Sequence, residues 1–262
     1  MHATLIDEII RMIRDGIPEL DKIRVEEVCI GLGYTGVLLD TGHLGVAATL
    51  LGEMSIDCCE VLKRAGELAG SSAEELMMLA RSWDLGESAV GIATLNALSQ
   101  IILEKRKNEY VMSFGDFIDE LDVGEDDVVG MVGYFEPFIP KLKKICRKLY
   151  IFERGMRKPE TLPDTAAEYI LPEVDVAILT GSAIVNKSLE HLLELAKNAR
   201  EIGVVGPSTS FIPDPLFKRG ATIVGGIEVI DPRKVMKVIK EGGGTRKFKP
   251  YVKFVNFRGK QR

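Results

Sequence analysis

The sequence predicts two domains of different class: an α+β domain over residues 1–121, and an α/β domain with a doubly wound, mostly parallel sheet over residues 122–262. Three observations predict this division. Early strand-like runs follow one another with very short connections, and such strands must pair antiparallel. After residue 127, apolar runs alternate with helical patterns, which indicates parallel strands joined by crossover helices. The acidic stretch 122–127 between the two patterns is typical of a linker.

The composition favours a globular protein with a sizeable core, because 46% of the 262 residues are hydrophobic and 28% are charged. No apolar run approaches the roughly 18 residues of a membrane span, and the start lacks the basic head and apolar run of a signal peptide. We therefore expect a cytoplasmic protein with no membrane partner. Cys29, Cys58, Cys59 and Cys146 lack Cys-x-x-Cys spacing and neighbouring histidines, so we expect reduced thiols rather than a zinc site.

The net charge of −5 is unevenly distributed. Residues 233–262 contain 11 basic residues and one acid, Glu241, which leaves 23 basic and 38 acidic residues, or −15, in the remainder. This basic end either meets nucleic acid or forms an ordered strand whose charges neutralise the acidic body. The alternation over 251–258 favours the strand, and a nucleic-acid partner is not expected because no nucleic-acid motif occurs elsewhere.

The N-terminal domain is expected to begin with an amphipathic helix and a small meander. Its helical stripe consists of Leu5, Ile6, Ile9, Ile10 and Ile13. Strands are expected at 23–32, 35–40 and 44–50. Helices are then expected at 58–69, at 71–83 after a capping-box pattern, from 87 or 88 to 107, and briefly at 113–121.

Asn96 is the one strongly polar residue in the middle of the long third helix, where residues 90–98 are otherwise apolar or small. That composition predicts a helix buried on most sides. A buried amide without partners costs about 1 to 3 kcal/mol, so Asn96 should bind either the backbone of an adjoining loop or a ligand. Both interpretations stay open from the sequence.

The second domain is expected to alternate five strands with helices. The strands are 128–133, 149–153, 174–180, 202–206 and 222–225. The helices are 138–147, 164–169, 187–199, 213–219 and 232–240. With the first strand central, the first and third strands flank the point where the winding reverses, so their loops face each other.

Three loops should therefore meet at the carboxyl edge of this sheet and form a pocket for an oxyanion or a polar small molecule. The candidate ligand-binding residues are Asn96, Gly133, Tyr134, Phe135, Glu153, Thr180, Gly181, Ser182, Asn186, Gly206, Pro207, Ser208 and Thr209. The turn after Gly133 should also direct the free N–H groups of the following helix toward an anion. A bulky residue in place of Gly181 is expected to fill the pocket and to leave the core intact.

The first loop departs from a dinucleotide fingerprint, since Gly130-x-x-Gly133 is followed by the bulky Tyr134 and Phe135. Glu153 lies where an acid usually reaches a ribose hydroxyl, although it could instead pair with Arg154 or Arg157. The three loops carry no lysine or arginine as a Walker-type site would, and the three histidines suggest no nucleophile with its base. A serine hydrolase is not expected.

Four segments together resemble a known family. They are Gly-Ile-Ala-Thr-Leu-Asn-Ala-Leu at 91–98, Val-Gly-Met-Val-Gly-Tyr-Phe at 129–135, Leu-Thr-Gly-Ser-Ala at 179–183 and Gly-Pro-Ser-Thr-Ser at 206–210. They resemble the motifs of the "putative heavy-metal chelation" family, over nearly the whole chain. The resemblance implies an enolase N-terminal-like domain, a Rossmann-like second domain and a site in the cleft between them, with Asn96 beside the Gly133 and Gly181 loops. Chelation is itself a proposal for that family.

Three hypotheses for the function follow. The first is a protein that binds a small anionic molecule, including a metal chelate, because the predicted cleft offers neither thiolate nor imidazole to a bare soft metal. The second is an enzyme that uses a nucleotide or an S-adenosylmethionine-like cofactor, with adenosine hydroxyls on Glu153. The third is a structural assembly protein. The sequence specifies no catalytic residue, cofactor or metal, and a homodimer is expected only from the frequency of two-fold dimers.

Overall fold

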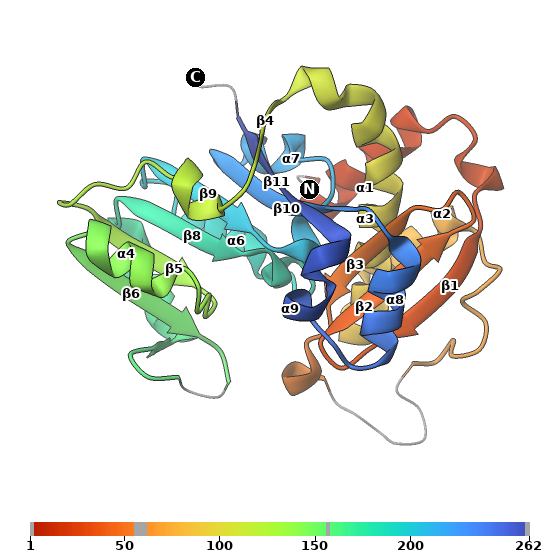
Figure 1. Cartoon of the computed structure of the whole chain (residues 1–262), viewed down its shortest axis with the longest axis horizontal. Coiled ribbons are helices and arrows are strands. Elements are labelled where there is room, and N and C mark those ends of the chain that lie inside the picture. Colours follow the sequence, from red (N-terminus) through yellow and green to blue (C-terminus); the bar gives the residue numbers. More distant parts are fainter. Residues whose placement is uncertain (1–2, 55–61, 156–157, 260–262) are drawn as a thin grey trace.

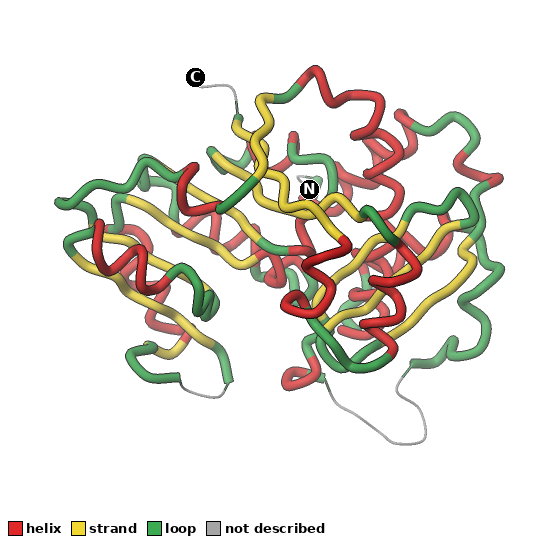
Figure 2. Tube along the Cα trace, viewed as in Figure 1, coloured by secondary structure: helices red, strands yellow, loops and turns green. Residues whose placement is uncertain are grey.

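The computed structural model describes residues 3–54, 62–155 and 158–259 (Figure 1). Within these residues the chain forms a three-stranded sheet in the order β1-β2-β3 and an eight-stranded sheet in the order β4-β11-β10-β9-β8-β5-β6-β7. Figure 2 shows both sheets in yellow, with helices packed around them. The protein is therefore a mixed α/β structure with one small antiparallel sheet and one large, mostly parallel sheet.

The N-terminal helix and meander are confirmed. Helix α1 (Leu5–Gly16) begins after Thr4, whose side chain accepts the backbone N–H of Asp7 in a capping box, and it buries the predicted stripe. Strands β1 (Val25–Ile30), β2 (Tyr34–Leu39) and β3 (Leu44–Ala48) pair antiparallel.

The region between the meander and the long helix differs from prediction. Residues 58–61 of the predicted 58–69 helix lie outside the described residues, and residues 62–69 form turns, so that part of the prediction is wrong. Helix α2 (Ala73–Met77) begins after Ser72 and continues as a 3-10 helix to Arg81. The predicted buried helix is confirmed as α3 (Leu85–Arg106). Strand β3 packs closely on it, because a Cβ on Gly45 would lie 1.9 Å from the carbonyl oxygen of Ala93.

The five predicted strands of the second half are confirmed, and one short strand joins them at the edge. The parallel strands are β5 (Val128–Val132), β6 (Lys148–Glu153), β7 (Leu162–Pro163), β8 (Val176–Thr180), β9 (Glu201–Val205) and β10 (Ile223–Val229). Chain order runs outward from β5 in both directions, so the winding reverses between β5 and β8. The predicted position of this reversal is confirmed.

Helices connect these strands and are mostly shorter than predicted. They are α4 (Ile139–Ile145), α5 (Ala167–Ile170), α6 (Leu189–Leu195), α7 (Asp214–Lys218), α8 (Pro232–Lys240) and α9 (Thr245–Phe248). The 3-10 helices are Leu20–Lys22, Leu51–Glu53, Met78–Arg81, Lys107–Glu109, Phe117–Glu120, Asp164–Ala166, Leu171–Glu173, Gly181–Ile184, Pro207–Thr209 and Lys249–Tyr251.

Two antiparallel strands complete the large sheet. Strand β11 (Val252–Arg258) confirms the predicted ordered strand at the basic end, and its Arg258 pairs with the buried Glu201. Strand β4 (Val111–Phe114) pairs with β11 at the sheet edge and was not predicted, so the expected 113–121 helix is reduced to a 3-10 helix at 117–120. The division of the chain at residue 121 stays a prediction.

The C-terminal segment also returns to the small sheet. Val235, Met236 and Ile239 of α8 share a hydrophobic cluster with Leu38 and Val46 of the meander. The first and last parts of the chain are thus packed together. No helix among the described residues is long and apolar enough to span a membrane.

Candidate functional site

The loops after β5 and β8 meet at the carboxyl edge of the large sheet, as predicted. Gly133 directly follows β5 and has a φ of +96°, a conformation that favours glycine. A Cβ built on Gly133 would lie 3.0 Å from Cβ of Thr180, the last residue of β8. The two loops at the winding reversal are therefore in direct contact.

The turn after Gly133 does not present a helix terminus to a ligand, which corrects the prediction. Helix α4 begins only at Ile139 and has seven residues. The backbone N–H of Tyr134 donates to Glu153 Oε2 at 2.8 Å. The Phe135 ring stacks on Phe138 with centroids 5.2 Å apart, within a hydrophobic cluster.

The Glu153 carboxylate accepts hydrogen bonds from backbone N–H groups. Besides Tyr134, its carboxylate accepts the backbone N–H of Arg154 at 3.0 Å. The Arg154 guanidinium binds Glu53 and Asp164, so the interpretation that it pairs with Glu153 is wrong. Arg157 lies outside the described residues. Glu153 holds the turns after β5 and β6 together, and a ribose-binding role stays a prediction.

The segment Thr180–Lys187, which we call the edge loop, is partly open to solvent. The hydroxyls of Thr180 and Ser182 lie 2.9 Å apart, and both residues are half-buried. Asn186 is also half-buried and donates from Nδ2 to Glu53 at 3.0 Å. The edge loop therefore places hydroxyl and amide groups at the sheet edge, as the sequence predicted.

In the segment Gly206–Ser210, which we call the inner loop, Ser208 and Thr209 are buried, so the prediction that these two residues line an open cleft is wrong. Ser208 and Thr209 are each 1% exposed. Ser208 Oγ accepts the backbone N–H of Ala48 at 2.9 Å, and Thr209 Oγ1 donates to the carbonyls of Gly206 and Gly225. Pro207, which is half-buried, uses its carbonyl to accept Ser210 Oγ at 2.8 Å. This loop joins the two sheets inside the protein.

Gly181 packs against the inner loop, so its role differs from the predicted one. A Cβ on Gly181 would lie 2.7 Å from Cγ2 and 2.9 Å from Oγ1 of Thr209. The expectation that a bulky residue at 181 would fill an open pocket is therefore wrong, because it would collide with the inner loop. Gly181 is a packing glycine.

Asn96 is fully buried and joins three segments, which confirms its expected burial and hydrogen bonding. Its Nδ2 donates to the carbonyls of Val46 at 2.8 Å, Ser208 at 3.1 Å and Pro207 at 3.4 Å. This geometry supports the interpretation of Asn96 as a partner of loop backbone. Its Oδ1 has no hydrogen-bond partner among the described residues.

Sequence reasoning missed two residues here, Glu53 and Lys187. We call Glu53, Arg154, Asn186 and Lys187 the edge cluster: hydrogen bonds link the first three, and Lys187 directly follows Asn186 in the chain. Glu53 Oε2 accepts Arg154 at 2.8 Å and Asn186 at 3.0 Å, so one carboxylate from the segment after β3 links the loops after β6 and β8. Arg154 also binds Asp164 at 2.6 Å. Arg154 was considered only as a partner of Glu153, and nothing local to Glu53 indicates its position.

Lys187 is the other missed residue, and its environment is unusual. It has a φ of +67°, which non-glycine residues rarely adopt, and it is half-buried. Its ammonium donates to Ser88 Oγ, in the first turn of α3, and to the Val185 carbonyl at 3.0 Å. Burial lowers the pKa of Lys187 to about 8. Lys187 directly follows the candidate residue Asn186 in the sequence, and this adjacency could have identified it.

The donors at this edge suit an anion better than a bare metal ion. The described residues contain no group of three or more His, Cys, Asp or Glu that could hold a metal. Burial raises the pKa of the Cys29 and Cys146 thiols, which favours the protonated form over the metal-binding thiolate. Cys58 and Cys59 lie outside the described residues.

These features define an α/β protein with a polar edge between its two halves, and comparison with known sequences assigns the family. Family models described as "Putative heavy-metal chelation" match residues 13–99 and residues 116–258. The chain belongs to this family. It is 30% identical to "Uncharacterized protein MJ0500" of Methanocaldococcus jannaschii over 262 residues, covering 95% of this chain and 96% of that protein.

Solved structures agree with this assignment. A protein of unknown function from the DUF364 family of Pyrococcus horikoshii superposes with a TM-score of 0.81 at 28% identity, covering 96% of this chain and 99% of that one. A DUF364-family protein from Desulfitobacterium hafniense gives 0.79 at 26% identity, covering 97% and 98%. The fold is thus shared over the whole length of these relatives.

Proposed function

We propose that this protein binds a small anionic molecule, such as an anionic metal chelate, at the edge cluster between its two halves. The observation that carries the proposal is the Lys187 ammonium. Its hydrogen-bond partners are a hydroxyl and a carbonyl, and among the described residues no carboxylate forms an ion pair with it. A half-buried cation of this kind is stabilised when an anion binds beside it.

The surroundings of Lys187 support an anion for a second reason. Ser88 lies in the first turn of the 22-residue helix α3, whose N-terminal end carries a partial positive charge. Burial disfavours the protonated lysine, and an anionic ligand offsets that cost. Because the pKa of about 8 lies above neutrality, most of the Lys187 side chains are still charged at pH 7.

The family description is compatible with this chemistry if the metal arrives already complexed. Carboxylates of a chelate can accept hydrogen bonds from Lys187, Asn186 and the Thr180–Ser182 hydroxyl pair. In this proposal the protein recognises the organic part of the complex. The fold interpretation that accompanies it is a Rossmann-like large sheet joined to an enolase N-terminal-like unit, with the ligand in the cleft between them.

A second candidate is an enzyme that uses a nucleotide or an S-adenosylmethionine-like cofactor. The strand order, outward from β5 through β6 and β7 on one side and through β8, β9 and β10 on the other, supports it, because dinucleotides bind at such a reversal. The Tyr134 N–H, which donates to Glu153, is less available to a phosphate. We therefore place this candidate second.

Calorimetry with defined probes tests the proposal. Nickel(II) citrate, nickel(II) ion alone, inorganic phosphate, ATP and S-adenosylmethionine are titrated into the unmodified chain and into Lys187→Met. We expect the anionic chelate to bind, and Lys187→Met to weaken it about tenfold through loss of a charged hydrogen bond. Methionine keeps an unbranched side chain that is one atom shorter, and it does not change the backbone preference at the positive φ.

Lys197→Met is the matched control, because Lys197 is 61% exposed and pairs with Glu194 on the surface. It removes the same charge and should leave the affinity unchanged. If both substitutions weaken binding of the chelate equally, the loss of affinity comes from the net charge of the protein and not from Lys187 in particular. Binding of ATP or S-adenosylmethionine alone would favour the second candidate, and no binding of any probe would favour the assembly hypothesis.

A further inference from the structure

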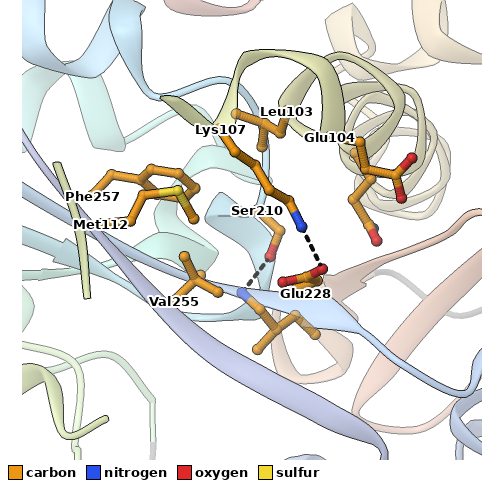
Figure 3. Close-up of a pocket in the computed structure, with 11 residues that line it drawn as sticks. Leu103, Glu104, Lys107, Met112, Ser210, Glu228, Val255 and Phe257 are labelled. Carbon is orange, nitrogen blue, oxygen red and sulfur yellow. Dashed lines mark hydrogen bonds and ion pairs between the residues drawn. The ribbon is translucent and has the colours of Figure 1, made fainter. Parts of the chain in front are cut away.

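A cavity of about 40 Å³ lies under the end of α3, away from the edge cluster (Figure 3). It is lined by the last turns of α3, by β10 and β11, and by the edge strand β4, and one side is open to solvent. None of the residues predicted to bind ligand lines this cavity.

The floor of the cavity is apolar. Leu103, Val255 and Phe257 are buried in one hydrophobic cluster, with Met112 packed against them. Ser210 also lines the cavity, but its hydroxyl already donates to Pro207 and accepts the N–H of Ile227, as Figure 3 shows for the latter. Water needs two to four polar partners, which this floor does not supply. A short hydrocarbon chain fits it better.

The mouth of the cavity is rich in acceptors. Glu104 and Glu228 carry carboxylates, and Gln100 already uses its Nε2 to donate to the Leu44 carbonyl at 2.7 Å, which leaves its Oε1 as an acceptor. The C-terminal end of α3 adds partial negative charge. A primary ammonium has three donors and no acceptor, so it suits these acceptors. It would compete there with His43, which lies 3.4 Å from Glu104, and with Lys107, which pairs with Glu228.

An ammonium–carboxylate contact already exists at the mouth of the cavity. The Lys107 side chain crosses the mouth and its ammonium lies 2.9 Å from Glu228 (Figure 3). This lysine is 47% exposed, and an ion pair so exposed contributes only about 0 to 1 kcal/mol. A free aliphatic amine can replace it and can also insert its chain into the apolar floor, which Lys107 leaves empty.

We propose that this cavity binds the ammonium form of a short linear primary amine, with the alkyl chain against Leu103, Val255 and Phe257 and the ammonium against Glu228 and Glu104. The site is separate from the edge cluster and does not depend on the proposed function. It would select an aliphatic cation over an anion or a neutral alcohol of the same length.

Calorimetric titration with n-butylammonium chloride, sodium butyrate and 1-butanol tests this site in the full chain. We expect n-butylammonium to bind once per chain, the alcohol about tenfold more weakly and butyrate not at all. Glu228→Gln should weaken n-butylammonium about tenfold, whereas Glu241→Gln, which removes an exposed carboxylate elsewhere, should not. Lys107→Met should strengthen binding several-fold, because the competing ammonium is gone.

The Met112 methyl resonance reports occupation of the cavity directly. It should shift on addition of n-butylammonium and stay unchanged with butyrate. Thermal unfolding verifies that each variant is folded. Equal binding of butyrate, equal effects of Glu228→Gln and Glu241→Gln, or no shift at Met112 would each overturn the proposal.

Discussion

The inner loop and the edge loop have similar sequences but differ in how deeply their polar groups are buried. Each follows a parallel strand of the same sheet and combines a glycine with hydroxyl residues. The hydroxyl residues of the inner loop, Ser208, Thr209 and Ser210, are buried, and their hydroxyls bind the protein's own backbone. The edge loop is half-buried, and it leads to Lys187, which has no charged partner among the described residues. Glycine–hydroxyl chemistry at a strand end therefore predicts accessible polar groups only where no second sheet covers the loop.

The largest expected effect is at Asn96, which attaches the inner loop to β3. Asn96→Leu removes the donor shared by three buried carbonyls, and we expect the free energy of unfolding to fall by about 3 kcal/mol. Urea denaturation measures it. The control Asn198→Leu, at an exposed residue, should change stability by less than about 0.5 kcal/mol. A loss at Asn96 no larger than the control would contradict a structural role for the inner loop.

Gly181 tests the contact between the two loops. Gly181→Ala places a methyl group 2.7 Å from Cγ2 of Thr209, and overpacking of this kind costs about 2 kcal/mol. Gly33→Ala is the control, because nothing lies within 4 Å of a Cβ built there. Thermal and urea unfolding should separate the two variants. If they are equally stable, the loops are less tightly packed than described.

Ser208 distinguishes a structural hydroxyl from a ligand-binding one. Ser208→Ala leaves the Ala48 N–H without its acceptor, and we expect a loss of about 1 kcal/mol in unfolding free energy. Affinity for nickel(II) citrate should stay the same in calorimetry. The opposite pattern, lower affinity at unchanged stability, would return Ser208 to the binding site.

Glu53 gives the smallest expected effect, in the edge cluster. Glu53→Gln removes a negative charge beside the proposed anion, while Arg154 keeps its ion pair with Asp164, so we expect about threefold tighter binding of nickel(II) citrate. Glu109→Gln, which alters an ion pair with Arg106 at the end of α3, is the control. Weaker binding in Glu53→Gln would mean that Glu53 itself contacts the ligand.

Much of the fold could be predicted because its signals are local. Continuous apolar runs identified the parallel strands, and the order in which they alternate with helices located the reversal between β5 and β8. Strand β4 was missed because its four residues have no periodic pattern and their partner β11 lies far along the chain.

The candidate site was predictable only in part, for the same reason. The contact of Gly133 with Thr180 follows from strand order, so it could be predicted. The burial of Ser208 depends on Ala48, 160 positions away, and the edge cluster depends on Glu53, 133 positions from Asn186. No periodicity or turn signal encodes such contacts. The low pKa of Lys187 likewise results from tertiary burial.

Titration of Lys187 itself tests the central claim most directly. In the lysine-labelled protein, the ¹³Cε resonance of Lys187, assigned by its absence in Lys187→Met, is followed from about pH 6 to 11. Burial predicts a midpoint of about 8, and bound nickel(II) citrate should raise it, because an adjacent anion favours the protonated form.

The lowered pKa of Lys187 also determines whether stability rises or falls with pH. Between pH 8 and the ordinary lysine value of 10.5, the unfolded chain binds a proton that folded Lys187 has lost, so stability should rise with pH relative to Lys187→Met. A midpoint near 8 that moves upward with the chelate is the predicted result. A midpoint near 10.5, unmoved by the chelate, would contradict the account, since Lys187 would then be an ordinary surface lysine.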